Sequence, residues 1–235
     1  MALPIQERNV TDIQIGHLLS IILSFAIVAP MNDIVDAPSG LRGPVETEKR
    51  DAIVTAAKEH FTRYGYDKTT VSDLAKAIGF SKGYIYKFFE SKQAIGEAIC
   101  TGCLSAVMAA VDEALVGNLT ATEKFRRLFK TIVEQSAALF FDERKLYDIA
   151  AFSSRENWNS SRIYAENVAS LLKSIVLEGR ESGEFERKTP LDEVCRGILQ
   201  VMQPFMNPMI LQHNLDVLPD APNEVTNLVL RSLAP

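Results

Sequence analysis

The sequence predicts an all-α protein with an N-terminal three-helix domain and a larger C-terminal helical domain. Apolar residues recur at the helical spacing i, i+3, i+4, i+7 along most of the chain, and Gly and Pro separate the periodic stretches. No stretch alternates apolar and polar residues convincingly, as a half-buried strand would. With 235 residues, 47% of them hydrophobic, the chain can bury the core that such a fold needs.

The first 44 residues differ from the rest of the chain. Residues 13–31 are almost entirely apolar and uncharged, and they approach the length of a membrane span. A signal sequence would need a cluster of positive charge before such a stretch, and none precedes it. We predict that residues 1–44 are a non-native or disordered extension, so that either Met31 is the physiological start or these residues form an optional extra arm. A membrane anchor is the alternative.

Residues 45–92 are predicted to form the N-terminal domain, in which a first helix covers about residues 46–64. The second helix begins after Thr70, which forms a capping-box variant with Asp73. Gly79 suits a left-handed C-cap, because it has no Cβ. The helix between these caps has one apolar face, formed by Val71, Leu74, Ala75 and Ile78.

A third helix, short and basic, follows a tight turn. Ser81 can cap it, and its inward face is predicted to be Ile85, Phe88 and Phe89. Two helices joined by a tight turn are typical of a helix-turn-helix, whose second helix enters the DNA major groove. Ser91 can cap the next helix and puts Lys92 in its first turn, where a phosphate would meet backbone amides and an ammonium group.

These residues resemble the TetR family of bacterial one-component transcriptional repressors, and the resemblance covers about residues 47–99. It includes the end of the first helix at residues 61–66. Phe88 departs from the pattern, because the family often has His or Tyr there, and a polar phosphate contact is then missing. The motifs that carry the resemblance are Thr70-Val71, Asp73-Leu74-Ala75, Gly79-Phe80-Ser81-Lys82-Gly83, Ile85-Tyr86, Phe89 and Ser91-Lys92.

The resemblance implies which side chains meet DNA. Lys82, Gly83 and Tyr84 would lie nearest the base edges, and Lys87 is a further candidate. The other members of the set would bind phosphates, which position the protein without specifying the sequence. The predicted DNA-binding residues are Thr70, Lys82, Gly83, Tyr84, Tyr86, Lys87 and Lys92.

Residues 93–235 are predicted to be helical throughout. Pro190 suits the first turn of a helix, whereas Pro204 and Pro208 must kink or break it. The predicted helices cover about residues 91–116, 122–139, 142–152, 160–181, a stretch that starts near residue 190, and 223–232.

The resemblance further implies that this second domain holds a ligand cavity and a dimer interface. Methionine and aromatic side chains give adaptable apolar walls. The predicted ligand-binding residues are Phe129, Phe140, Phe152, Trp158, Met202 and Met206. The last two long helices would form a homodimer, which can read two DNA half-sites. The candidate interface residues are Leu191, Val194, Cys195, Ile198, Leu199, Val225, Leu228 and Val229.

Three cysteines give no disulfide framework and suit a reducing cytoplasm. Cys100 and Cys103 have CxxC spacing, but zinc would need four ligands and no second pair exists. We therefore expect buried thiols, and a redox-sensing repressor that uses this pair is kept as an alternative. The sequence has no catalytic motif such as GxSxG or HExxH, so we expect no enzyme activity, metal or cofactor.

The charge of the chain is uneven. The net charge is -5, yet residues 44–92 carry nine Lys and Arg against seven Asp and Glu. A weakly basic reading domain on an acidic body suits binding to specific DNA sites. The sequence therefore predicts a cytoplasmic repressor that binds a palindromic double-stranded DNA operator as a homodimer. A small hydrophobic effector would release it, and we do not expect it to bind membranes.

Overall fold

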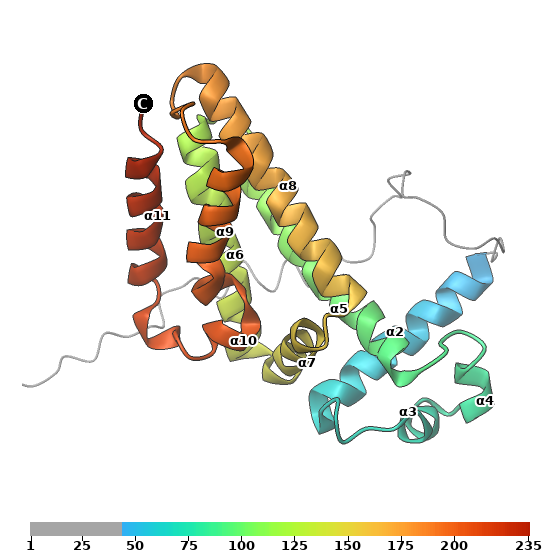
Figure 1. Cartoon of the computed structure of the whole chain (residues 1–235). Helices are drawn as coiled ribbons and strands as arrows, with labels where there is room; N and C mark the ends of the chain where they lie inside the picture. Colours follow the sequence, from blue (N-terminus) through green and yellow to red (C-terminus); the bar gives the residue numbers. More distant parts are fainter. Residues whose placement is uncertain (1–43) are drawn as a thin grey trace, which may run out of the picture. The chain divides into compact units, whose positions relative to one another are not determined.

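The structure is a computed structural model that describes residues 44–235, and every regular element in this part is helical (Figure 1). This confirms the all-α prediction. The apolar stretch at residues 13–31 and the proposed start at Met31 lie outside the described residues. The helices are α2 (Pro44–Tyr64), α3 (Val71–Ile78), α4 (Lys82–Ile85), α5 (Lys92–Ala114), α6 (Ala121–Asp142), α7 (Arg144–Arg155), α8 (Asn159–Ser182), α9 (Leu191–Met206), α10 (Pro208–Leu211) and α11 (Asp220–Ser232).

One group of buried side chains, here called the N-terminal core, holds α2, α3 and α4 together. Leu74 and Ile85 from α3 and α4 have no exposed surface. The group also draws on α5, α7 and the residue before α8, so packing continues past the predicted domain boundary at residue 92. Its members are Ile53, Ala57, Phe61, Tyr66, Val71, Leu74, Ala75, Ile85, Phe89, Ile95, Ile99, Leu146, Ile149 and Trp158.

A second group, here called the C-terminal core, joins α5, α6, α8, α9 and α11. Figure 1 shows α5 beside α8 and α9 beside α11, and both pairs of helices are in contact. Phe125 and Phe129 of α6 pack edge to face, with ring centroids 4.9 Å apart, and both are buried. Because α5 also supplies Val107 and Val111 to this group, a single helix runs through both cores.

The two prolines of the α9 region behave differently. Pro204 lies inside α9, near its C-terminal end. The helix does not break there but continues for two more residues, to Met206. Pro208 marks the predicted break, because α9 ends at Met206 and Asn207 is extended with ψ of 119°. An extended residue before proline avoids the clash with the proline ring. Asn207 then caps α10 by accepting a hydrogen bond from the Met209 amide at 2.9 Å.

Candidate DNA-binding and ligand-binding sites

The start of α3 has the capping box that the sequence predicts. The carboxylate of Asp73 accepts hydrogen bonds from the Thr70 amide at 2.9 Å and from the Thr70 hydroxyl at 2.7 Å. In return the Thr70 hydroxyl oxygen accepts from the Asp73 amide at 3.2 Å. Gly79 ends the helix in the left-handed region with φ of 77°, as predicted. These caps fix both ends of α3 and therefore the turn that leads into α4.

The Asp73 carboxyl makes the stability of this turn depend on pH. Its hydrogen bonds from Thr70 lower its pKa below the ordinary value of 3.8. A lowered pKa in the folded state gives stability that is present above the unfolded-state pKa and lost as pH falls through the folded-state pKa. We expect Asp73→Asn to flatten the acid side of the stability curve below about pH 4. Urea unfolding at a series of pH values measures this, with the exposed Asp51→Asn as the control. Equal acid slopes in wild type and Asp73→Asn would contradict it.

The α4 helix is shorter than the sequence predicts. It ends at Ile85, and residues 86–88 continue as turns in which the Lys87 amide donates to the Tyr84 carbonyl at 3.2 Å. The next helix starts at Lys92, so the chain must leave the helical path before the extended N-cap residue Ser91. The Ser81 hydroxyl caps α4 by accepting from the Tyr84 amide at 3.1 Å. Of the predicted inward residues, Ile85 and Phe89 are buried and Phe88 is half-buried.

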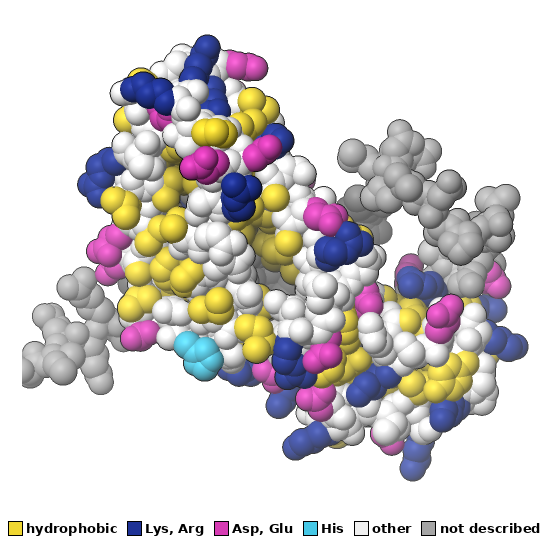
Figure 2. All heavy atoms as spheres, viewed as in Figure 1, with side chains coloured by type: hydrophobic (Ala, Val, Ile, Leu, Met, Phe, Trp, Pro, Cys, Tyr) yellow, Lys and Arg dark blue, Asp and Glu magenta, His cyan; other side chains and the backbone are white. Residues whose placement is uncertain are grey.

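Most of the side chains predicted to meet DNA are exposed. Residues 82–87, here called the reading segment, expose Lys82, Gly83, Tyr86 and Lys87. The Lys82 ammonium lies 5.7 Å from the centroid of the Tyr86 ring. Figure 2 shows Lys and Arg side chains spread over the surface of α2, α3 and α4, with hydrophobic side chains between them. This mixture of cations and aromatic rings suits contact with a phosphate backbone.

Tyr84 and Lys92 are the two predicted DNA-binding residues that are half-buried, and both contact other side chains of the protein. Tyr84 is half-buried, and its ring centroid lies 4.5 Å from that of Phe80 and 5.3 Å from that of Phe88. The Lys92 ammonium donates to the Tyr66 carbonyl at 3.1 Å and lies 4.2 Å from the centroid of the Tyr66 ring. An ammonium group has three donors, so this bond leaves two for a phosphate. Contact of either residue with DNA stays a prediction.

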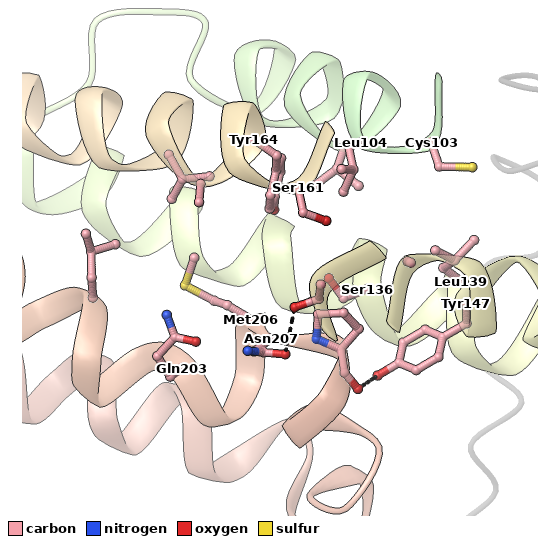
Figure 3. Close-up of a pocket in the computed structure, with 17 residues that line it drawn as sticks. Cys103, Leu104, Ser136, Leu139, Tyr147, Ser161, Tyr164, Gln203, Met206 and Asn207 are labelled. Carbon is pink, nitrogen blue, oxygen red and sulfur yellow. Dashed lines mark hydrogen bonds between the residues drawn. The ribbon is translucent and has the colours of Figure 1, made fainter. Parts of the chain in front are cut away.

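A pocket of about 220 Å³ lies among the six helices α5 to α10 (Figure 3). Figure 3 shows Tyr164 and Ser161 on α8 facing Gln203, Met206 and Asn207 on the α9 side. The rest of the wall is Cys103, Leu104, Val107, Ser136, Leu139, Tyr147, Ala150, Ser154, Ala165, Val168, Leu199 and Pro208.

Of the six predicted ligand-binding residues, only Met206 lines this pocket. Phe129 and Met202 are buried in the C-terminal core. The others pack on aromatic rings: Phe140 on Tyr147, and Phe152 and Trp158 on each other and on Tyr66. Aromatic and methionine residues indicate apolar surroundings, but they do not show whether a side chain lines a pocket or is packed in a filled core. The signal that sequence reasoning missed was polar groups, such as the Tyr164 hydroxyl and the Gln203 amide, on otherwise apolar helix faces.

The cysteine pair lies at the edge of this region on α5. Cys100 is buried, and Cys103 lines the pocket. Burial raises the pKa of the Cys103 thiol to about 11 and also raises the pKa of Cys100, so both are protonated near pH 7. Protonated thiols react slowly, which disfavours the redox-sensing alternative. Among residues 44–235, no group of three or more His, Cys, Asp or Glu side chains could hold a metal ion.

One helix in the described part of the chain is long and apolar enough to cross a membrane. It is α5, whose buried residues include Ile95 and Ile99 of the N-terminal core and Val107 and Val111 of the C-terminal core. A core helix of a globular protein meets the same criteria of length and composition, so this is weak evidence for a membrane span.

Two family models match this chain. The model described as bacterial regulatory proteins, tetR family, matches residues 53–99, which contain α3, α4 and the reading segment. The model described as tetracyclin repressor-like, C-terminal domain, matches residues 121–225. Together the two matches cover more than half of the chain.

Individual relatives agree with the family models. YhgD of Bacillus subtilis, an uncharacterized HTH-type transcriptional regulator, is 33% identical over 87 residues, which are 37% of this chain and 46% of YhgD. The match thus spans about half the length of that relative. YdgC of the same organism, also an uncharacterized HTH-type regulator, is 23% identical over 188 residues, which are 80% of this chain and 94% of YdgC.

A solved structure shows the same fold. The fatty acid degradation regulator FadR from Bacillus halodurans superposes with a TM-score of 0.60 at 22% identity, covering 81% of this chain and 97% of FadR. Three observations therefore agree on the family. They are the capped helix-turn-helix, the helical body that contains a pocket, and the two family matches. The chain belongs to the TetR family of bacterial regulatory proteins, and it is a DNA-binding transcriptional regulator rather than an enzyme.

Proposed function

We propose that this regulator is a cytoplasmic repressor that binds a palindromic operator as a homodimer and leaves it when a small apolar ligand enters the pocket. The observation that carries the proposal is that two helices, α5 and α7, contribute side chains both to the N-terminal core and to the pocket wall. A ligand that moves either helix therefore acts on the packing that holds the reading segment.

The shared role of α7 follows from its helical spacing. Leu146 and Ile149 are buried in the N-terminal core, whereas Tyr147, Ala150 and Ser154 line the pocket. The Tyr147 hydroxyl also donates to the Pro208 carbonyl at 2.6 Å, which ties α7 to the start of α10 (Figure 3). The helix is thus packed on both sides and can transmit a displacement from the pocket to the N-terminal core.

The helix α5 is a second connection between the N-terminal core and the pocket. Ile95 and Ile99 belong to the N-terminal core, and Cys103, Leu104 and Val107 line the pocket. The free energy by which the ligand shifts the protein toward the released state cannot exceed the difference between its binding free energies for the released and the DNA-binding states. We infer that the released state differs in the spacing of the two reading segments of a dimer.

The proposed dimer uses the outer face of α9 and α11. Val201 of α9 is 47% exposed and Leu228 of α11 is 60% exposed, so this face has apolar side chains that the single chain does not cover. Leu228 was an interface candidate from the sequence and Val201 was not, whereas the candidates Cys195, Ile198 and Val229 are buried in the C-terminal core of their own chain. The interface proposal therefore rests on the exposed residues, and a twofold pairing would use the same face from both copies.

Operator binding can be tested by removing the cations of the reading segment. We expect Lys82→Ala with Lys87→Ala to lower affinity for the DNA upstream of the gene by about 10- to 100-fold, because each lysine contact to DNA adds about 1 kcal/mol or more. Fluorescence anisotropy with labelled DNA measures this over a range of salt concentrations. Lys130→Ala, which removes a 65% exposed lysine on α6, is the control. If the double variant binds as tightly as Lys130→Ala, the reading segment is assigned wrongly.

A further inference from the structure

Several polar groups in the pocket wall have no hydrogen-bond partner among the described residues. The Tyr164 hydroxyl and the side-chain amide of Gln203 make no such bond within residues 44–235, although both side chains line the pocket. Asn207 uses its amide oxygen to accept from the Met209 amide at 2.9 Å, and its amide nitrogen is without a partner in the same part of the chain. Tyr164, Gln203 and Asn207 are half-buried, so these unpaired donors and acceptors are open to a ligand or to water in the pocket.

These groups face one another across the pocket. Figure 3 shows Tyr164 on α8 pointing toward Gln203 and Met206 on α9. The hydroxyl of Tyr164 is a donor, and the amide of Gln203 offers both a donor and an acceptor. The remaining wall is mainly apolar and includes Leu104, Val107, Val168 and Leu199. The pocket thus suits a molecule with an apolar body and one end that accepts hydrogen bonds.

The described wall of the pocket is uncharged. All seventeen residues that line it have side chains without a formal charge at neutral pH. At the Cys103 end, the nearby charges of Lys58 and Glu143 lie 3.8 Å apart and offset each other. Burial raises the pKa of Tyr164, so its hydroxyl stays protonated near neutral pH and remains a donor. A carboxylate placed here would lose its hydration without gaining a cation.

The volume limits the size of the ligand. The 220 Å³ available lies below the range of roughly 300–1,000 Å³ that is usual for drug-sized ligands. The pocket therefore suits a ligand smaller than a typical drug-sized molecule.

We propose that the pocket binds a small uncharged molecule with an apolar body and a carbonyl or amide end that is held by the Tyr164 hydroxyl and the Gln203 amide. This inference rests on the proposed function, in which occupation of the pocket releases DNA. It adds the chemical class of the ligand and the two side chains that select it.

Hexanamide and hexanoate are matched probes, because both have eight non-hydrogen atoms and they differ in the charge of the polar end. We expect calorimetric titration of the full chain at pH 7.5 to show that hexanamide binds at least about tenfold more tightly than hexanoate. Equal or tighter binding of hexanoate overturns the proposal. Absence of binding by both compounds overturns the proposed size and chemistry.

Two variants test the selecting residues. We expect Tyr164→Phe to lower the affinity for hexanamide by about five- to tenfold, because it removes one hydrogen bond, and Gln203→Met to have a similar effect. Gln200→Met is the matched control, since Gln200 is an exposed residue on the same helix, outside this pocket wall. Unchanged hexanamide affinity in both pocket variants would show that these side chains do not hold the ligand.

A DNA-binding measurement separates this inference from the proposed function. The anisotropy of labelled operator is followed with and without hexanamide. Operator binding together with preferred binding of hexanoate would refute only the ligand class. Hexanamide binding without any operator binding would refute only the repressor. Release of operator by hexanamide, reduced in Tyr164→Phe, supports both.

Discussion

A protein that carries Val201→Glu and Leu228→Glu together is expected to be monomeric and to lose more than about 100-fold of its operator affinity. Both side chains are exposed apolar residues on α9 and α11, with 47% and 60% of their surfaces accessible. In a twofold dimer the two changes would put four carboxylates into one interface, where they would lose hydration and repel one another. Light scattering on a size-exclusion column measures the oligomeric state at fixed protein concentration.

The loss of DNA affinity follows from geometry. A dimer places two reading segments on two half-sites, so the second contact is made at a high effective concentration. The monomer can use only one half-site, and its affinity for a full palindrome should approach that for half of it. Ile163→Glu with Val116→Glu is the control, because these residues are 44% and 73% exposed but lie on α8 and in the loop after α5. A Val201→Glu/Leu228→Glu protein that remains dimeric would place the interface elsewhere.

The helix ends around the reading segment could be predicted from the sequence because short-range chemistry sets them. Thr70, Ser81 and Ser91 each accept a hydrogen bond from an amide three residues later. Gly79 has the positive φ that its place after the last apolar residue of α3 requires. Each of these features involves neighbours in the sequence, so no knowledge of the tertiary fold was needed.

Features that depend on distant residues could not be predicted in the same way. The Lys92 ammonium bonds to the Tyr66 carbonyl, 26 residues earlier. Helical periodicity identified Phe129 as inward-facing, but it could not show whether the space in front of its ring was filled by the C-terminal core or left open. The pocket walls come from six helices, α5 to α10, so their identity follows only from the packing of all of them. For the same reason, the sequence could not predict that α7 contributes to both the N-terminal core and the pocket wall.

The domain boundary predicted at residue 92 illustrates a third limit of prediction from the sequence. The family resemblance to the helix-turn-helix covers the residues predicted to contact DNA, whereas the N-terminal core also includes Leu146 and Ile149 from α7. The stretch of sequence that resembles the family is therefore shorter than the group of residues that pack together around it. The same helix lines the pocket with Tyr147, Ala150 and Ser154, so α7 joins the N-terminal core to the pocket.

Gly179→Ala is expected to destabilise the fold by about 2–4 kcal/mol, although alanine favours a helix by about 1 kcal/mol over glycine. A Cβ added at Gly179 of α8 would lie 2.1 Å from the nearest atom of the Phe185 ring. Phe185 is 3% exposed and belongs to the C-terminal core, and its amide donates to the Gly179 carbonyl at 2.9 Å. The ring and the helix backbone are thus both held in place, so the added methyl group must displace one of them.

Urea unfolding followed by circular dichroism measures this effect at a fixed protein concentration, which keeps any dimer contribution constant. Gly102→Ala is the matched control: Gly102 is an exposed glycine within α5, an added Cβ would meet nothing within 4 Å, and the change should be neutral or stabilising. In a Phe185→Ala background the ring is absent, so Gly179→Ala should then cost little, and the double-mutant cycle isolates the clash. An equal cost of Gly179→Ala with and without the ring would show that the destabilisation has another origin than the contact between α8 and Phe185.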